Sequence, residues 1–429
     1  MASRSINVNL PGLAFNQLLD TNVAQLYSAA TALKPDGNLA VSPLSILYAS
    51  ALMYIGSSGS TKSNLDKSFH FDQFFNSNAD SVLSAFSTAM PNLTMSKTPK
   101  PKPRKPNSQN GAMEIELEPP VFFLSTGRDE PFVLNLANAI FVKQNAPLTE
   151  KYRNGAVNQL QSEVMTKDFQ SNPEKARGEI NTWVSDTTNG RIKDLLPSGA
   201  VSPDTVAVLA NALYFKASWE SSLKFNPHDT KKRDFTLLNG QTVQVDTMSN
   251  FLHGLNYAED ADLDAKYIEY TYTNNQGAML FILPNKKDGL RALEKKLTAN
   301  VFGNLKKKVK SERVNLQIPK FKVEADLNLK SMLQKIGVKE AFEKSSADFS
   351  NMTPQKVWIG DAFHKTFVEI DEKGTEAAAA SAFVMMAGAS PFAPKQAPPK
   401  DFIADHPFIF AIRHNPTNAI LFIGRVEKL

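Results

Sequence analysis

Residues 370–388 read IDEKGTEAAAASAFVMMAG, the most unusual stretch of the chain because of its central alanine run. Read locally, the segment predicts a helix with Thr375 as N-cap and Gly388 as C-cap. Read as a strand, it has one face of small residues followed by large ones: Thr375, Ala377, Ala379 and Ser381, then Phe383 and Met385. Such a face suits a strand that slides into a crowded sheet. Periodicity cannot choose between these structures, so the flanking sequence must decide.

The composition is that of an ordinary globular chain. Of its 429 residues, 42% are hydrophobic and 21% are charged, which excludes disorder throughout, a collagen-like chain and a coiled coil. Cysteine is absent, which excludes a disulfide scaffold, a thiol nucleophile and a thiolate metal site. No apolar run approaches the roughly 18 residues of a membrane span, so we expect no membrane partner.

Positive charge is concentrated in one segment. The net charge is +5, and residues 97–105 hold five basic residues and no acidic one. This balance is too mild to indicate nucleic-acid binding by the whole chain. Residues 95–131 form an insertion whose proline-rich first half is either a tolerated linker or a docking arm for a polyanion. The candidate polyanion contacts are Lys97, Lys100, Lys102, Arg104 and Lys105.

Hydrophobic periodicity predicts helices early in the chain and strands late. Helical spacing occurs at residues 12–33, 43–56, 80–90, 174–188 and 328–336. Runs rich in β-branched and aromatic residues predict strands at residues 132–142, 206–215, 265–272, 278–284, 409–412 and 419–426. This order indicates an α+β fold rather than repeating βαβ units.

Motifs for catalysis and metal binding are missing from the sequence. Residues 56–63 nearly match a phosphate-binding loop, but Thr61 stands where a glycine must precede Lys62, so we interpret the segment as a helix-capping linker. The six histidines show no metal-binding spacing, and there is no G-x-S-x-G elbow. We therefore expect no enzyme, no metal and no cofactor.

Several segments resemble the serpin family, and the resemblance covers nearly the whole chain. Residues 370–380, IDEKGTEAAAA, look like the hinge of the family's reactive loop. Residues 402–426, FIADHPFIFAIRHNPTNAILFIGRV, look like its C-terminal signature. Other family landmarks match in the same order: NLAVSPLSI, INTWVSDTTNGRIKDLL, LANALYFKASW, FILP and IPKF. On these segments the chain is identified as a member of the serpin family, of a leaderless invertebrate-like or intracellular type.

The resemblance implies a single α+β domain over residues 1–429. Its expected parts are a central mixed β-sheet, two smaller sheets, about nine helices and an exposed reactive loop at residues 372–401. In this family a protease cleaves the loop, which enters the central sheet as a new strand while the acyl bond to the protease persists. We therefore expect a suicide-substrate inhibitor of a serine or cysteine protease. The alternative is a non-inhibitory serpin that acts as a binding, storage or chaperone protein.

The resemblance also implies roles for individual residues. The bond expected to be cleaved is Gly388–Ala389, with residues 385–392 left open because the loop is longer than usual. A hinge of small inward residues can enter the sheet without burying bulk or charge. The hinge residues are Glu372, Gly374, Thr375, Glu376, Ala377, Ala378, Ala379, Ala380 and Ser381. The region where the central strands part is expected to contain Ser42, Ser45, Asn211 and His364, with Trp219 where the loop first enters.

The residues around the expected bond indicate a class of partner. Glycine there suits an elastase-like serine protease or a papain-like cysteine protease, whereas the acidic pocket of a trypsin-like enzyme needs Lys or Arg. We expect a monomer. The N-terminal sequence lacks the apolar run of a signal peptide, so we expect action in the cytoplasm or after unconventional secretion. A signal peptide that had been removed would instead allow conventional secretion.

Overall fold

The computed structural model describes residues 10–93, 123–124, 132–299, 301–375 and 397–429. The expected bond Gly388–Ala389, the hinge residues from Glu376 onward and the basic residues of the 95–131 insertion lie outside the described residues. The polyanion contacts therefore stay a prediction.

Most of the helices lie in the first half of the chain, as the periodicity predicted. The second helix shows how the sequence sets a boundary: Ser42 caps it by accepting a hydrogen bond from the Ser45 N–H, and Pro43 occupies the first turn. The α-helices are α1 (Leu10–Leu33), α2 (Pro43–Gly56), α3 (Gly59–Phe69), α4 (Phe71–Phe75), α5 (Ala79–Leu93), α6 (Glu150–Asn154), α7 (Pro173–Thr187), α8 (Leu290–Lys296), α9 (Val301–Lys308) and α10 (Leu329–Lys335). The expectation of about nine helices is roughly right.

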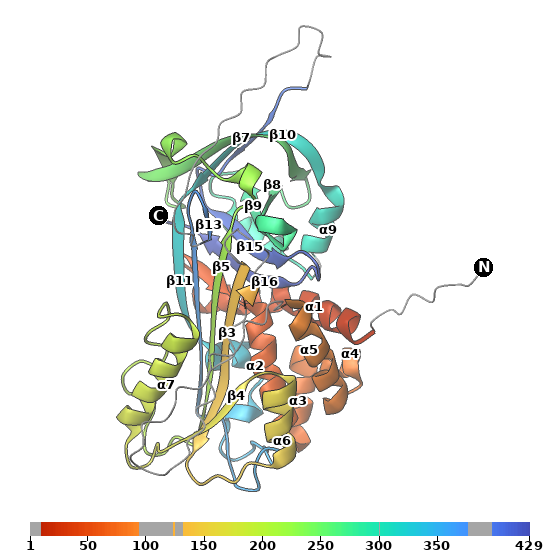
Figure 1. Ribbon diagram of the computed structural model, residues 1–429, viewed down its shortest axis with the longest axis vertical. Helices are drawn as coiled ribbons and strands as arrows, with labels where there is room; N and C mark the ends of the chain where they lie inside the picture. Colours follow the sequence, from red (N-terminus) through yellow and green to blue (C-terminus); the bar gives the residue numbers. More distant parts are fainter. Residues whose placement is uncertain (1–9, 94–122, 125–131, 300, 376–396) are drawn as a thin grey trace, which may run out of the picture.

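A mixed sheet runs through the centre of the molecule (Figure 1). Its strands are β11 (Phe321–Asn328), β12 (Asp361–Ile370), β13 (Gly374–Thr375), β5 (Ala207–Ser218), β3 (Phe132–Lys143), β2 (Phe123–Leu124) and β4 (Glu163–Lys167). β12 and β5 run parallel to each other, while β11 and β3 pair antiparallel on the outer sides. The prediction of a central mixed sheet is confirmed.

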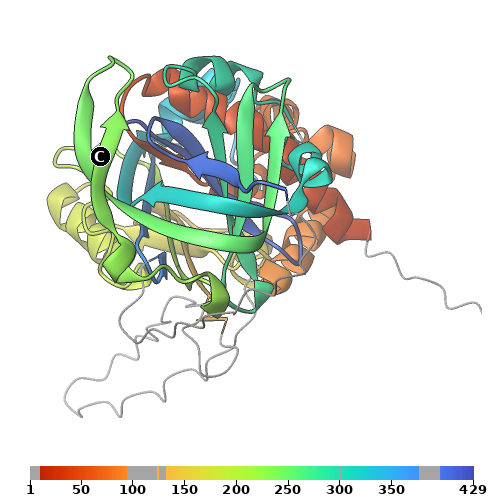
Figure 2. The ribbon, with the colours of Figure 1, turned by 90° about the horizontal axis from the view of Figure 1, so that it is seen from above.

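The remaining strands form a second sheet across one end of the molecule, best seen from above in Figure 2. They are β1 (Leu39–Val41), β16 (Ile420–Val426), β15 (Phe408–His414), β9 (Gly277–Pro284), β8 (Ala265–Thr271), β7 (Thr242–Asp260), β10 (Lys310–Pro319), β14 (Lys400–Ile403) and β6 (Lys231–Thr236). The long strand β7 pairs with β8, β10 and β6, so in the described residues these strands form one continuous sheet and not the two smaller sheets expected from the sequence.

Apolar side chains cover both faces of the central sheet. Along β3, Leu134 and Leu136 join the large core with α1 and α2, whereas Val133 and Ala137 pack in a second cluster with α7. This alternation follows from strand geometry, because successive side chains point to opposite faces. Figure 1 shows α7 on one side of the sheet and α2 and α5 on the other. The α+β fold is therefore as predicted.

Candidate functional site

The two central strands of the sheet, β5 and β12, part at one end. Residues 361–367 of β12 pair directly with residues 208–214 of β5. Beyond them the short strand β13 lies between the two, with Thr375 opposite Ala217 on β5 and Ile370 on β12. We call the boundary between β5 and β12 the seam, and residues 371–375 the hinge base. The first residues of the predicted hinge are thus strand, not the first turn of a helix.

Gly374 fits between the strands only because it has no side chain. A Cβ atom there would lie 2.2 Å from the carbonyl oxygen of Ala217 and 2.6 Å from the Cα of Ser218. Backbone atoms cannot move aside without breaking the pairing of β13 with β5. A glycine at this place is therefore a steric requirement of the seated hinge base.

Thr375, expected to be the first inward residue, is completely buried in the seam. Its Oγ1 lies 2.7 Å from the hydroxyl oxygen of Tyr272. The ring of Tyr272 is stacked on Trp219, with centroids 4.7 Å apart and planes nearly parallel. Trp219 therefore lies beside the hinge base and reaches Thr375 through Tyr272; its role in entry of the loop stays a prediction.

The backbone of the hinge base is held to the same tryptophan. The Trp219 backbone N–H donates to the carbonyl of Lys373 at 2.8 Å, and its indole Nε1–H donates to the carbonyl of Asp371 at 2.9 Å. The Asp371 carboxylate in turn accepts from the backbone N–H groups of Lys373 and Gly374, at 2.8 and 3.2 Å. These bonds fix the turn that leads from β12 back into the seam.

Glu372 anchors the other side of this turn. Its carboxylate accepts from the Thr230 hydroxyl at 2.8 Å and pairs with the Lys320 ammonium at 3.1 Å. Burial alone would raise the pKa of Glu372, but its own backbone N–H, Thr230 and Lys320 favour the charged form and hold the pKa below its usual value. The acid is therefore an ionised anchor of the hinge base.

In the lower part of the seam, where β5 and β12 pair directly, a buried polar cluster joins the two strands to α2. It consists of Ser42, Ser45, Asn211 and His364, the four residues that the resemblance assigned to the parting of the strands. Asn211 on β5 and His364 on β12 are register partners, and the His364 ring hydrogen-bonds the Asn211 side-chain oxygen. Asn211 also accepts from the Ser45 hydroxyl at 2.8 Å and donates to the Ser45 carbonyl at 2.9 Å.

The protonation state of His364 follows from its two partners. Its Nε2 accepts from the backbone N–H of Ser42 at 3.2 Å, so the ring proton sits on Nδ1 and is donated to Asn211. Burial lowers the pKa of His364 to about 3, because the charged ring would lose its hydration. The cluster is therefore neutral, and it must break wherever a strand separates β5 from β12.

Sequence reasoning missed Tyr272, Thr230 and Lys320. Tyr272 was included only as part of an expected strand, and its partner Thr375 is 103 residues away in the chain. Thr230 lies 142 residues from Glu372. A single sequence carries no signal for such pairs, because periodicity reports only the neighbours within one element.

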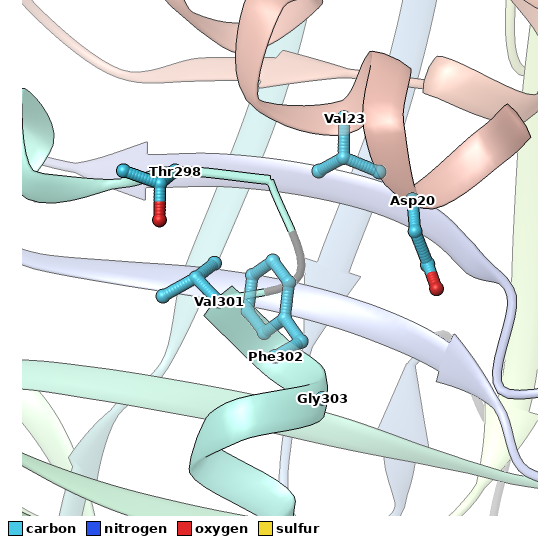
Figure 3. Close-up of a pocket in the computed structure, with 6 residues that line it drawn as sticks. All are labelled: Asp20, Val23, Thr298, Val301, Phe302 and Gly303. Atoms are coloured by element: carbon cyan, nitrogen blue, oxygen red, sulfur yellow. The ribbon is translucent and has the colours of Figure 1, made fainter. Parts of the chain in front are cut away.

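A small pocket lies elsewhere, between α1 and α9 (Figure 3). It is lined by Asp20, Val23, Thr298, Val301, Phe302 and Gly303, none of which belongs to the seam. Burial raises the pKa of Asp20 to about 6. Within the described ranges, no helix combines the length and apolar character of a membrane span, and no three His, Cys, Asp or Glu side chains gather as a metal site.

Comparisons with known proteins agree with this geometry. A family model described as Serpin (serine protease inhibitor) matches residues 20–429. The chain is 34% identical to Serpin B3 of Homo sapiens, with 92% of this chain and 94% of that protein covered. It is 32% identical to the leukocyte elastase inhibitor of Equus caballus, with 94% and 96% covered.

The structural comparison gives the same result. The crystal structure of Serpin48, described as a highly specific serpin of the insect Tenebrio molitor, superposes with a TM-score of 0.78. That alignment covers 97% of this chain and 98% of Serpin48, at 29% identity. The chain therefore belongs to the serpin family.

Proposed function

We propose that this serpin inhibits a protease by acting as a suicide substrate. The observation that carries the proposal is the seated hinge base: Thr375 is already buried between β5 and β12, in the position of a new central strand. Strand insertion after cleavage would continue from this point rather than begin anew.

The sequence beyond the hinge base fits a strand that extends downward in the seam. Thr375 has its side chain in the core, so in an inserted strand alternation would put Ala377, Ala379 and Ser381 on the same face. These side chains are small and uncharged, and their burial would leave no unpaired charge in the sheet. Each inserted residue would replace the direct pairing of β5 with β12 by its own pairing with both strands.

The chemistry belongs to the protease. Its serine hydroxyl or cysteine thiol would attack the carbonyl carbon of Gly388, and the bond to the Ala389 nitrogen would break. The released amine takes the proton that the protease's general base removed from the nucleophile. Gly388 would then be held as an ester or thioester. Insertion before water hydrolyses that bond would trap the protease, so this chain needs no catalytic residue of its own.

We further propose an elastase-like serine protease or a papain-like cysteine protease as the target. Gly388 and its small neighbours Ala387 and Ala389 fit the small specificity pocket of an elastase-like enzyme. Support also comes from the name of one relative, the leukocyte elastase inhibitor of Equus caballus.

The test is incubation with leukocyte elastase, papain and trypsin, followed by denaturing electrophoresis and mass spectrometry. We expect leukocyte elastase or papain to form a complex that survives boiling in detergent and releases a C-terminal fragment beginning at Ala389. Clean cleavage by all three enzymes without a complex would overturn the inhibitory function. A complex whose fragment begins at Gln396 would overturn only the assigned class of protease, because Lys395 is a trypsin-like site.

A further inference from the structure

The register of the hinge base predicts which loop residue would reach the buried polar cluster. Thr375 lies opposite Ala217 on β5 and Ile370 on β12, and β13 runs antiparallel to both strands. An inserted strand in the same register would place the residue six positions after Thr375 opposite Asn211 on β5 and opposite His364 on β12. These two residues are already register partners of each other. The pairings on the two sides of the seam therefore lead to the same row of the sheet.

The residue six positions after Thr375 is Ser381, whose place in an inserted strand follows from this register. An even number of steps along a strand keeps a side chain on the same face. Thr375 is opposite Ala217, which shares its face of β5 with Asn211, so the Ser381 side chain would point toward the cluster. Directly opposite residues of antiparallel strands have Cβ atoms about 5 Å apart, a distance at which their side chains interact. Ser381 would thus have a polar neighbour on each side.

A hydroxyl group has the two hydrogen-bonding functions that the separated pair would need. In the uncut protein His364 donates its Nδ1–H to the side-chain oxygen of Asn211. A strand between them would break that bond and leave a buried donor without an acceptor, which is costly in a protein interior. A serine hydroxyl can accept one hydrogen bond and donate another. Ser381 would therefore accept from His364 and donate to Asn211, without adding charge to the sheet.

The inward residue four positions earlier shows that the hydroxyl suits this row in particular. In the same register Ala377 would lie between Phe215 on β5 and Val368 on β12. Both of these side chains are apolar and completely buried. A methyl group therefore suits the row of Ala377, whereas the row of Ser381 has a donor on one strand and an acceptor on the other.

We propose that Ser381 completes the buried polar cluster in the inserted state, as a positioning residue that replaces the direct bond between His364 and Asn211. The inference rests on the proposed inhibitory function, because insertion of the cut loop is what would carry Ser381 to this row. The hydroxyl would also fix the register of the new strand. A slip of two residues would bring Ala379 or Phe383 to the row, and neither side chain can make these hydrogen bonds.

The test is the rise in thermal midpoint when a trace of trypsin cuts the loop at Lys395, with the cut confirmed by mass spectrometry. The unmodified protein is compared with Ser381→Ala and Ser381→Thr. We expect the rise in Ser381→Ala to be smaller by roughly 2 °C, because the His364 donor stays unpaired in the inserted state. Ser381→Thr keeps the hydroxyl and should show the full rise. The midpoints of the uncut proteins should agree, since the uncut seam bonds His364 to Asn211 directly.

The matched control is Ala377→Ser combined with Ser381→Ala, which keeps the composition and moves the hydroxyl four residues along the same face. Between Phe215 and Val368 the hydroxyl would have no polar side chain beside it, so the rise should stay at least as low as in Ser381→Ala. A full rise in Ser381→Ala, an equal shift of its cut and uncut forms, or recovery in the control would overturn the role of Ser381. No rise in the unmodified protein would instead contradict loop insertion, and the inhibitory function with it.

Discussion

The upper and lower parts of the seam differ in what lies between β5 and β12. In the lower part the two strands pair directly over residues 361–367 and 208–214, and His364 bonds Asn211 across the boundary. In the upper part β13 already separates them, held by Tyr272, Trp219 and the Glu372–Lys320 pair. The sheet is thus open at one end and locked further down. Insertion would be guided by the upper part and resisted by the lower part.

The largest effect is expected from Thr375→Arg, which blocks the upper part. The arginine cannot occupy the buried position without an unpaired charge in the sheet, so the loop would stay outside after cleavage. We expect the protein to become a substrate, with the stoichiometry of inhibition raised on the order of tenfold or more, as measured by titration of the trapped protease. Thr375→Ser, which keeps the hydroxyl, should inhibit normally. One-to-one trapping by the arginine variant would show that entry does not pass through this position.

Asn211→Ala should weaken the lower part. It leaves the buried His364 Nδ1–H without its acceptor and leaves the Ser45 hydroxyl with only the Ser42 carbonyl, at 3.2 Å. This loss of about 2 kcal/mol should speed spontaneous opening of the seam roughly 30-fold. The rate can be followed as loss of inhibitory activity on storage at 37 °C. Asn181→Ala is the control, because it removes two buried hydrogen bonds between Asn181 on α7 and the backbone of Leu196, outside the seam. Equal loss of activity in both variants would mean that the cluster is only part of the general core.

Acid should also open the lower part, through His364. The unfolded chain takes up this proton near the ordinary histidine pKa of 6.5, whereas in the folded protein burial lowers the pKa of His364 to about 3. The unfolded state therefore binds more protons between these values, so the stability is complete above pH 6.5 and falls with decreasing pH. The free energy of unfolding should fall by about 1.4 kcal/mol for each pH unit in this range.

The measurement is the thermal midpoint between pH 7 and pH 3.5, for the unmodified protein and for His364→Gln. For a chain of this length about 0.9 kcal/mol corresponds to one degree, so His364 should contribute roughly 1.5 °C per pH unit. We expect the thermal midpoint of the variant to fall less steeply with decreasing pH, by that amount. Parallel curves would place the acid sensitivity elsewhere, for example at His414, whose pKa is lowered by burial to about 4.

The smallest effect is expected from Tyr272→Phe in the upper part. The variant keeps the stacking on Trp219 but loses one buried hydrogen bond to Thr375, worth about 1 kcal/mol. Amide hydrogen exchange of residues 370–375 should become roughly fivefold faster. Tyr48→Phe, which loses a bond to the carbonyl of Phe86 among the helices, should leave that exchange unchanged. No change in the Tyr272 variant would mean that the backbone bonds alone seat the hinge base.

The sequence could predict elements more readily than the contacts between them. Residues 12–33 and 174–188 were expected to be helices from their spacing, and α1 and α7 end within a few residues of those limits. The lower part of the seam could also be located, because the resemblance named all four members of its cluster. The structure adds the tautomer of His364 and its bond across the two strands.

The upper part could not be predicted in the same detail. Local propensity allowed Thr375 to be a helix N-cap, and only the pairing with Ala217 and Ile370 makes it a strand residue. The close approach of Gly374 to Ala217 is likewise a long-range contact. Long-range strand pairing therefore determines the structure at both positions, whereas the alanine run that follows has a local preference for helix.

The most direct test of strand entry is the thermal midpoint before and after the loop is cut. We expect a trace of trypsin to cut the loop at Lys395 without forming a complex. Insertion would add about ten backbone hydrogen bonds of about 1 kcal/mol each, which at about 0.9 kcal/mol per degree raises the midpoint on the order of 10 °C. We expect this rise in the unmodified protein and its absence in Thr375→Arg. An unchanged midpoint in the cut, unmodified protein would contradict entry of the loop into the seam.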